Sequence, residues 1–246
     1  MRTLLLSFIL SISIVFPVLA ANYSTLDNRA LRTPVEKETD IQTLVDYLTS
    51  GLTDAEEKAR VIAAWIAYRV DFDTYKQEKY EDSTESKKRD FAIPDSGDPF
   101  FTRKGTSKDF ADLFQRMAEI AGLQVATIEG YTNSNYRDRA SSLWYWNAVV
   151  ADNKWNLLDI SKAAPRSNLD QDSRSNRSYA RDIQRRLDNP ESLNRKIRKE
   201  SRRTKVFQED DKWFFVKPKD MIETHFPRNP DWQLLNPPVR SSRFFK

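Results

Sequence analysis

The sequence contains no cysteine, one histidine and five glycines in 246 residues. Without cysteine the chain forms no disulfide bond and supports no thiol-based mechanism, so packing alone must hold its core. One histidine and scattered carboxylates provide no metal-ligand spacing, and we predict no metal site. Neither of the glycine-rich fingerprints that bind phosphate groups occurs, and we therefore predict no nucleotide and no other cofactor.

A long apolar run occurs at the N-terminus. Arg2 precedes a stretch from Leu4 to Phe16 that only serines interrupt, and Val18-Leu19-Ala20 supplies a small-residue cleavage site. We predict a signal peptide over residues 1–20 and an exported protein, periplasmic or secreted. Removing Arg2 lowers the formal net charge from +4 to +3, so the mature chain is only mildly basic. No later stretch approaches the roughly 20 apolar residues of a transmembrane helix.

The rest of the chain has the composition of one globular domain with additions, with 39% hydrophobic and 31% charged residues. We expect a lead-in segment and a first helix over residues 21–52, where residues 21–38 show no clear period. The main domain is expected over residues 53–246, and its first helix begins with Thr53 and Glu56 as a capping pair. Residues 71–104, which mix charged residues, serines and two prolines, are predicted to be a surface loop.

One amphipathic helix is predicted from Gly105 to Ala121. Thr106 and Asp109 form a capping-box-like pair at its start, and Ser107 lies in its first turn. Apolar residues then follow at three- and four-residue spacing, so one face of the helix is expected to be buried. Its N-terminal N–H groups are the place where an anion or a nucleophile would be stabilised.

Three runs of β-branched and aromatic residues follow this helix and predict an antiparallel sheet, hence an α+β fold. They span residues 124–131, 143–151 and 154–161, and Asp152-Asn153 suits a two-residue hairpin turn. With that turn, Trp146 lies opposite Asp159, and Trp144 lies two residues along the same face. We therefore expect Trp144 within diagonal reach of the Asp159 carboxylate.

These segments, GTSKDFADLFQRMAEIAGLQVATIEGY and WYWNAVVADNKWNLLD, resemble the core of the transglutaminase-like superfamily, which shares its cysteine chemistry with papain-like proteins. The resemblance runs from about Asp54 to Leu235, and the closing FFVKPKDMIETHFPRNPDWQLL is similar to the cytokinesis and kyphoscoliosis subgroup. It implies a papain-like or transglutaminase-like core, with N-terminal helices packed on an antiparallel sheet. It also implies a Cys-His-Asp triad, whose positions are occupied here by Ser107, Trp144 and Asp159.

Two of the three triad positions have therefore changed chemistry. Ser107 is either a nucleophile or a first-turn serine bonded locally, and a hydroxyl needs an adjacent base more than a thiol does. Trp144 donates an N–H and cannot act as a base, so it either fills the pocket or stacks on a ligand. Asp159, with no triad histidine to orient, is expected to accept the Trp144 indole N–H or backbone N–H groups. His225, placed at a predicted helix end, is interpreted as a structural histidine.

Residues 162–205 read as a basic insertion. They carry clusters of arginine and lysine, and the spacing of Ile183, Leu187, Leu193 and Ile197 predicts one or two basic helices on the surface. This segment is either a solvated face or a binding surface for an anionic polymer, such as nucleic acid, an anionic glycan or a lipid surface. After it, residues 212–216 are expected to form a strand, and Pro218 is expected to open a short helix.

Three functions are consistent with these observations. The leading hypothesis is an exported transglutaminase-like protein that has lost catalysis and binds a protein or peptide ligand in the former substrate cleft, through Ser107, Trp144 and Tyr145. The first alternative is a hydrolase or acyltransferase based on Ser107 with an unrecognised base. The second is an envelope protein that binds polyanions through residues 162–205.

Overall fold

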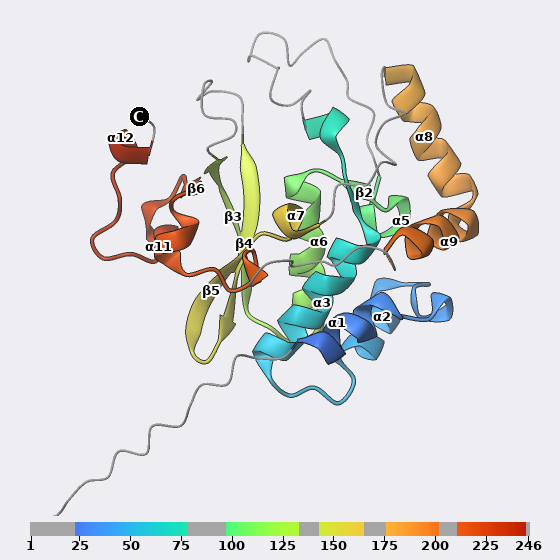
Figure 1. Ribbon diagram of the computed structural model, residues 1–246, viewed down its shortest axis with the longest axis horizontal. Helices are drawn as coiled ribbons and strands as arrows, with labels where there is room; N and C mark the ends of the chain where they lie inside the picture. Colours follow the sequence, from blue (N-terminus) through green and yellow to red (C-terminus); the bar gives the residue numbers. More distant parts are fainter. Residues whose placement is uncertain (1–22, 78–96, 133–142, 165–175, 202–210, 245–246) are drawn as a thin grey trace, which may run out of the picture.

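The computed structural model describes residues 23–77, 97–132, 143–164, 176–201 and 211–244 (Figure 1). The predicted signal peptide lies outside these residues. The described chain combines helices with a four-stranded antiparallel sheet of order β5-β4-β3-β6, which confirms the predicted α+β class. The strands are β3 (Val125–Thr132), β4 (Trp144–Ala151), β5 (Lys154–Leu158) and β6 (His225–Pro227). None of the described helices is both long and apolar enough to cross a bilayer.

Helix α6 (Ser107–Ile120) lies between the sheet and helix α3 (Ala55–Arg69), as Figure 1 shows. Its apolar face is buried, as the spacing predicted. The Asp109 carboxylate accepts the Thr106 backbone N–H at 2.8 Å and the Thr106 hydroxyl at 3.0 Å, so the predicted capping pair is present. Gly105 is required before it because a Cβ there would lie 2.6 Å from the Asp109 Cβ.

The N-terminal helices differ from expectation in two details. Helix α2 (Ile41–Thr49) forms as predicted, but the cap of α3 is Asp54 rather than Thr53, because Asp54 Oδ1 accepts the Glu57 N–H at 2.9 Å. The lead-in segment is partly helical, with α1 at Ser24–Leu31 and a 3₁₀ turn, η1, at Val35–Lys37. It lacks an apolar period because only Leu26 and Ala30 of α1 are buried.

The interpretation of residues 71–104 as a surface loop is wrong for the part that the structure describes. Strand β1 (Asp71–Phe72) pairs in parallel with β2 (Lys104–Gly105), and helix α5 (Pro99–Thr102) precedes β2. Charged residues in this stretch are buried because they meet partners far away in the sequence; Lys104, for example, lies 3.5 Å from Asp182. Residues 78–96 lie outside the description.

The β4–β5 hairpin has the predicted turn and register. Asp152 and Asn153 both adopt positive φ, 51° and 57°, as a type I′ turn requires. Strand β5 ends at Leu158, after which Asp159 caps the short helix α7 (Ile160–Ala163).

The C-terminal part returns to the sheet. The strand expected at residues 212–216 does not form, because Asp211 and Phe215 adopt positive φ and only Val216 bridges to Leu157. Pro218 opens α11 (Pro218–Met221) as predicted. Strand β6 then pairs with β3, and the η4 turn (Pro230–Gln233) and α12 (Ser241–Phe244) follow.

The basic insertion forms two helices, α8 (Asn176–Asp188) and α9 (Pro190–Ser201), as predicted. Ile183 and Ile197 are buried and Leu187 is exposed. Part of the basic charge points inward, since Arg186 is buried against Asp71 and Asp182. Part of the charge of these helices is therefore balanced by acidic residues in the interior, and the rest lies at the surface.

Candidate functional site

Ser107 occupies the first position of α6 and is almost completely buried. Its hydroxyl lies 3.4 Å from Gln77 Oε1, and the Tyr145 backbone N–H donates to Ser107 Oγ across 3.4 Å. The Ser107 N–H also donates to Gln77 Oε1, at 3.3 Å. An amide oxygen and a backbone N–H are not proton acceptors of catalytic strength, so these partners position the hydroxyl without activating it.

Trp144 and Asp159 make the contact that the hairpin register predicted. The indole Nε1 donates to Asp159 Oδ2 across 2.8 Å, and Trp144 is 3% and Asp159 1% exposed. The Trp144 ring stacks on Phe72 with centroids 5.5 Å apart, and Lys162 Nζ lies over the Trp144 ring, 4.0 Å from its centroid. The indole is thus held by stacking, a cation and a buried hydrogen bond.

Asp159 also contacts a histidine, and the predicted placement of that histidine at a helix end is wrong. His225 lies on β6 rather than at a helix end, and its Nε2 is 2.9 Å from Asp159 Oδ2. Its Nδ1 is 2.8 Å from the Thr224 hydroxyl, and its ring lies edge-on to the rings of Trp146 and Trp213. Both ring nitrogens of His225 are therefore engaged, Nε2 by the Asp159 carboxylate and Nδ1 by the Thr224 hydroxyl.

The electrostatics of this group follow from its contacts. Burial alone would raise the pKa of the Asp159 carboxyl, but hydrogen bonding and charge from His225, the charge of Lys162 and the Ser161 hydroxyl hold that pKa below its usual value. Asp159 Oδ1 accepts from Ser161 Oγ at 2.5 Å and from the Lys162 N–H at 3.2 Å. With Trp144 and His225 on Oδ2, the carboxylate accepts four donors, which fills its roughly four lone-pair sites. Asp159 is an ionised structural acceptor.

Tyr145 is the one partly exposed residue among the three predicted to contact a ligand. Its hydroxyl donates to Glu129 Oε2 at 3.1 Å, and Lys108 Nζ lies 5.6 Å from its ring centroid. Burial and the Glu129 charge raise the pKa of Tyr145 to about 12. Trp144, Asp159 and His225 therefore contact one another in the interior. Ser107 is bonded instead to Gln77 and to the Tyr145 backbone, and the partly exposed Tyr145 side chain forms the rim of the site.

Sequence reasoning missed Gln77 and the role of His225. Gln77 lies inside the predicted loop of residues 71–104 and carries no motif. His225 is the single imidazole of the chain, which marked it as unusual, but its partner could be assigned only once β6 was placed beside β3. Among the described residues, no group of three or more histidine, aspartate or glutamate side chains gathers in the manner of a metal site.

Comparison with known proteins relates this geometry to a family. The family model of the transglutaminase-like superfamily matches residues 42–160, a segment that contains Ser107, Trp144 and Asp159 but not His225. Kyphoscoliosis peptidase of Homo sapiens is 26% identical over 204 residues, covering 81% of this chain and 25% of that protein. Cytokinesis protein 3 of Schizosaccharomyces pombe is 25% identical over 223 residues, covering 88% of this chain and 20% of that protein.

A crystal structure of a TGase is similar over 63% of this chain and 36% of its own, with a TM-score of 0.40 and 12% sequence identity. The chain thus spans about a quarter or less of the length of the two named relatives.

Proposed function

We propose that this chain, whose residues 42–160 form a transglutaminase-like domain, is an exported, non-catalytic binding or scaffolding module. The observation that carries the proposal is the 2.8 Å hydrogen bond from Trp144 Nε1 to Asp159 Oδ2. At the position where the family's histidine is expected, an N–H without a lone pair is fixed toward the carboxylate. No proton can be accepted there.

The neighbouring groups support the same conclusion. A serine hydroxyl is a weak nucleophile unless a base removes its proton, and the partners of Ser107 are an amide oxygen and a backbone N–H. His225, the one imidazole, is buried and engaged at both ring nitrogens by Asp159 and Thr224. The polar side-chain groups of Trp144, Asp159 and His225 therefore satisfy one another, as in a structural core.

Binding is proposed to use the rim of the former site. Tyr145 is partly exposed and is flanked by the exposed Lys108, and a partly exposed aromatic beside a cation suits a protein or peptide ligand. Export is proposed from the signal-peptide pattern of residues 1–20. The name of the human relative states a peptidase; for this chain we propose that peptidase and transamidase chemistry is absent.

An activity assay tests the catalytic part of the proposal. The purified protein is incubated with a glutamine-containing peptide and a labelled amine, and separately with an unlabelled peptide whose hydrolysis is followed by mass spectrometry. We expect the wild type to match Ser107→Ala and Ser50→Ala, the latter a control at the exposed end of α2. Turnover that Ser107→Ala abolishes and Ser50→Ala preserves would establish the serine hydrolase or acyltransferase alternative instead.

A cross-linking experiment tests the binding part. A photoreactive phenylalanine analogue replaces Tyr145 at the rim or Tyr47, which is half-buried on α2. We expect a defined adduct from envelope fractions with the Tyr145 replacement and none with Tyr47. Equal labelling from both positions, or none from either, contradicts a ligand at the rim.

A polyanion-binding function has one structural observation in its favour. A cavity of about 300 Å³ between α8 and α9 is lined by Arg185 and Lys196, and Arg185 has a side chain 65% exposed. Binding through such exposed charges weakens steeply with salt, because neutralised phosphates or sulfates release counterions. Deleting residues 165–201 should abolish salt-sensitive binding to heparin, and unchanged binding excludes this surface.

A further inference from the structure

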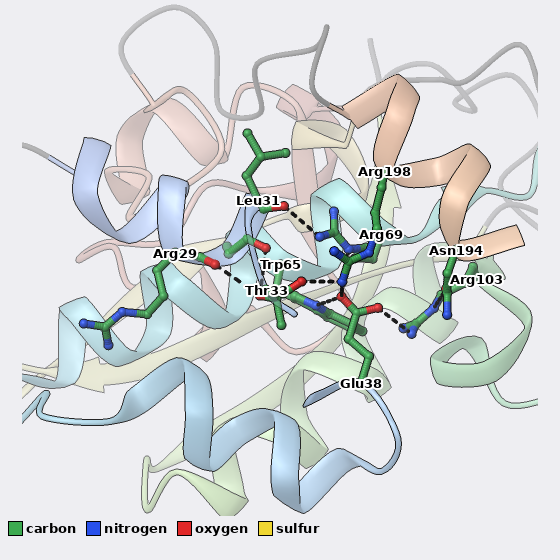
Figure 2. Close-up of polar contacts among 10 residues, drawn as sticks. Arg29, Leu31, Thr33, Glu38, Trp65, Arg69, Arg103, Asn194 and Arg198 are labelled. Atoms are coloured by element: carbon green, nitrogen blue, oxygen red, sulfur yellow. Dashed lines mark hydrogen bonds and ion pairs between the residues drawn. The ribbon is translucent and has the colours of Figure 1, made fainter. Parts of the chain in front are cut away.

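A second buried polar cluster is centred on Glu38, which follows the η1 turn. Three arginines surround its carboxylate: Arg69 at the end of α3, Arg103 after α5 and Arg198 on α9 (Figure 2). The nitrogen-to-oxygen distances are 3.0 Å for Arg69, 3.1 Å for Arg103 and 3.1 Å for Arg198. The Glu38 side chain is 0% exposed.

The Glu38 carboxylate accepts four hydrogen bonds, three of them on one oxygen. Oε1 accepts from Arg69 Nε, from Arg198 Nη2 and, at 3.3 Å, from the Trp65 indole. Oε2 accepts from Arg103 Nη2. Oε1, which accepts three donors, is saturated, whereas Oε2 accepts one donor and retains a lone pair. The carboxylate therefore cannot accept all of the remaining N–H groups of the three arginines.

Protein acceptors take some of the remaining donors, as Figure 2 shows in part. The Leu31 carbonyl accepts from Arg69 Nη2 at 2.8 Å, and the Thr33 carbonyl accepts from Arg198 Nη2. Asn194 Oδ1 accepts from Arg103 Nε at 3.4 Å. One buried nitrogen of each arginine still has no partner among the described residues: Arg69 Nη1, Arg103 Nη1 and Arg198 Nε.

The charge of the cluster is also unbalanced. Three guanidinium groups and one carboxylate leave two excess positive charges in a site that water reaches poorly, which is costly. Burial, together with the charges of Arg69 and Arg198, lowers the pKa of Arg103 to about 10 against the opposing effect of Glu38. Burial likewise lowers the pKa of Arg69. A native fold rarely leaves such a group uncompensated.

We propose that Arg69, Arg103 and Arg198 form a binding site for one doubly charged tetrahedral oxyanion, phosphate or sulfate. The charge of the anion equals the excess charge of the cluster, and its oxygens supply acceptors for the three unpartnered nitrogens. Arg198 is the point of access, because its side chain is 19% exposed whereas those of Arg69 and Arg103 are 0% and 3% exposed. A bound anion joins α9 to α3 and to the segment after α5.

Calorimetric titration of the full-length mature protein with inorganic phosphate and with sulfate tests this site, against chloride at matched ionic strength. We expect saturable binding of both oxyanions and none of chloride. Arg198→Gln should weaken phosphate binding at least tenfold. The control is Arg195→Gln, an exposed residue on the same helix, which removes the same charge and should change the affinity less than twofold.

Two further variants separate a ligand site from a structural network. Arg198→Lys keeps the charge but removes the guanidinium fork, and we expect it to weaken binding as well. Glu38→Gln removes the competing carboxylate charge, so phosphate should bind more tightly and should restore thermal stability that the variant loses in chloride. If Glu38→Gln does not fold in chloride, its folding in phosphate supports the site equally.

Absence of saturable oxyanion binding by the wild type overturns the proposal. Equal loss of phosphate affinity in Arg198→Gln and Arg195→Gln also overturns it, because the anion would then respond only to the overall charge of the protein. Glycerol 3-phosphate identifies the source of the anion. Affinity equal to that of inorganic phosphate indicates a phosphate group carried by a larger ligand. Binding of inorganic phosphate alone indicates a free ion that stabilises the fold.

Discussion

Trp144 donates its indole N–H to Asp159 Oδ2 across 2.8 Å, and both residues are almost completely buried. The same oxygen lies 2.9 Å from His225 Nε2. Two donors from different strands therefore converge on one carboxylate oxygen. The carboxylate is thus engaged by an indole and an imidazole that are both buried.

Trp144→Phe should destabilise the protein by about 1.5–3 kcal/mol, because it removes a buried hydrogen bond to a charged acceptor. Trp155→Phe is the matched control, since Trp155 packs edge-on to Trp232 and is only partly buried. Urea unfolding followed by circular dichroism measures both changes. Equal losses in the two variants would mean that the indole N–H contributes nothing beyond ring volume.

Stability should fall at low pH partly through Asp159. Its pKa is lower in the folded protein than in the unfolded chain, so the stabilisation is complete above the unfolded pKa of about 3.9 and is lost as the pH falls through the folded pKa. Asp159→Asn should therefore flatten the decline of the unfolding free energy below about pH 5. Asp98→Asn, at a more exposed ion pair with Arg116, should flatten it less. If Asp159→Asn leaves the pH dependence of the unfolding free energy unchanged, the lowered pKa of Asp159 in the folded protein is contradicted.

Gly130→Ala should disrupt the attachment of β6. A Cβ at Gly130 would lie 2.3 Å from the Phe226 carbonyl oxygen and 2.5 Å from the Trp146 ring. We expect a loss of about 3 kcal/mol, and exposure of His225 detectable as a change in its imidazole NMR signals. Gly122→Ala provides the comparison, because its added Cβ meets no atom within 4 Å and only its positive φ is unfavourable.

Asn153 should tolerate glycine but not alanine. Its φ is 57°, a conformation that costs most residues about 1–2 kcal/mol and glycine almost nothing. Asn153→Gly should leave the melting temperature unchanged or raise it, whereas Asn153→Ala should lower stability by about 1 kcal/mol. Lys154→Ala, at an exposed residue of β5, serves as the control. A lower melting temperature for the glycine variant would contradict the turn assignment.

The features predicted correctly from sequence are those set by local pattern. The Thr106 and Asp109 pair fixed the start of α6, and the Asp152-Asn153 turn fixed a register from which the Trp144–Asp159 contact followed. These residues are separated by 15 positions or fewer. Capping, periodicity and turn chemistry act over such distances, and they need no knowledge of the remaining chain.

The features missed depend on pairing across long separations. Helix α1 has few apolar residues. It is held instead by Asp27, whose carboxylate accepts two hydrogen bonds, of 2.8 and 2.7 Å, from the guanidinium of Arg60 on α3. The Glu38 cluster draws side chains from four separate segments. Strand β6 is three residues long and ends in proline, so no alternation could reveal it. In each case a tertiary contact, absent from any local window, decides the structure.

His225 lies 66 residues after Asp159, whereas Trp144 lies 15 residues before it, so the contact with the imidazole closes a much longer loop of chain than the contact with the indole. Until residue 225 has reached β3, the edge of β3 that β6 covers is open to other extended chains. A chain in which β6 has not yet docked therefore exposes a free sheet edge and an Asp159 carboxylate that lacks one of its four donors.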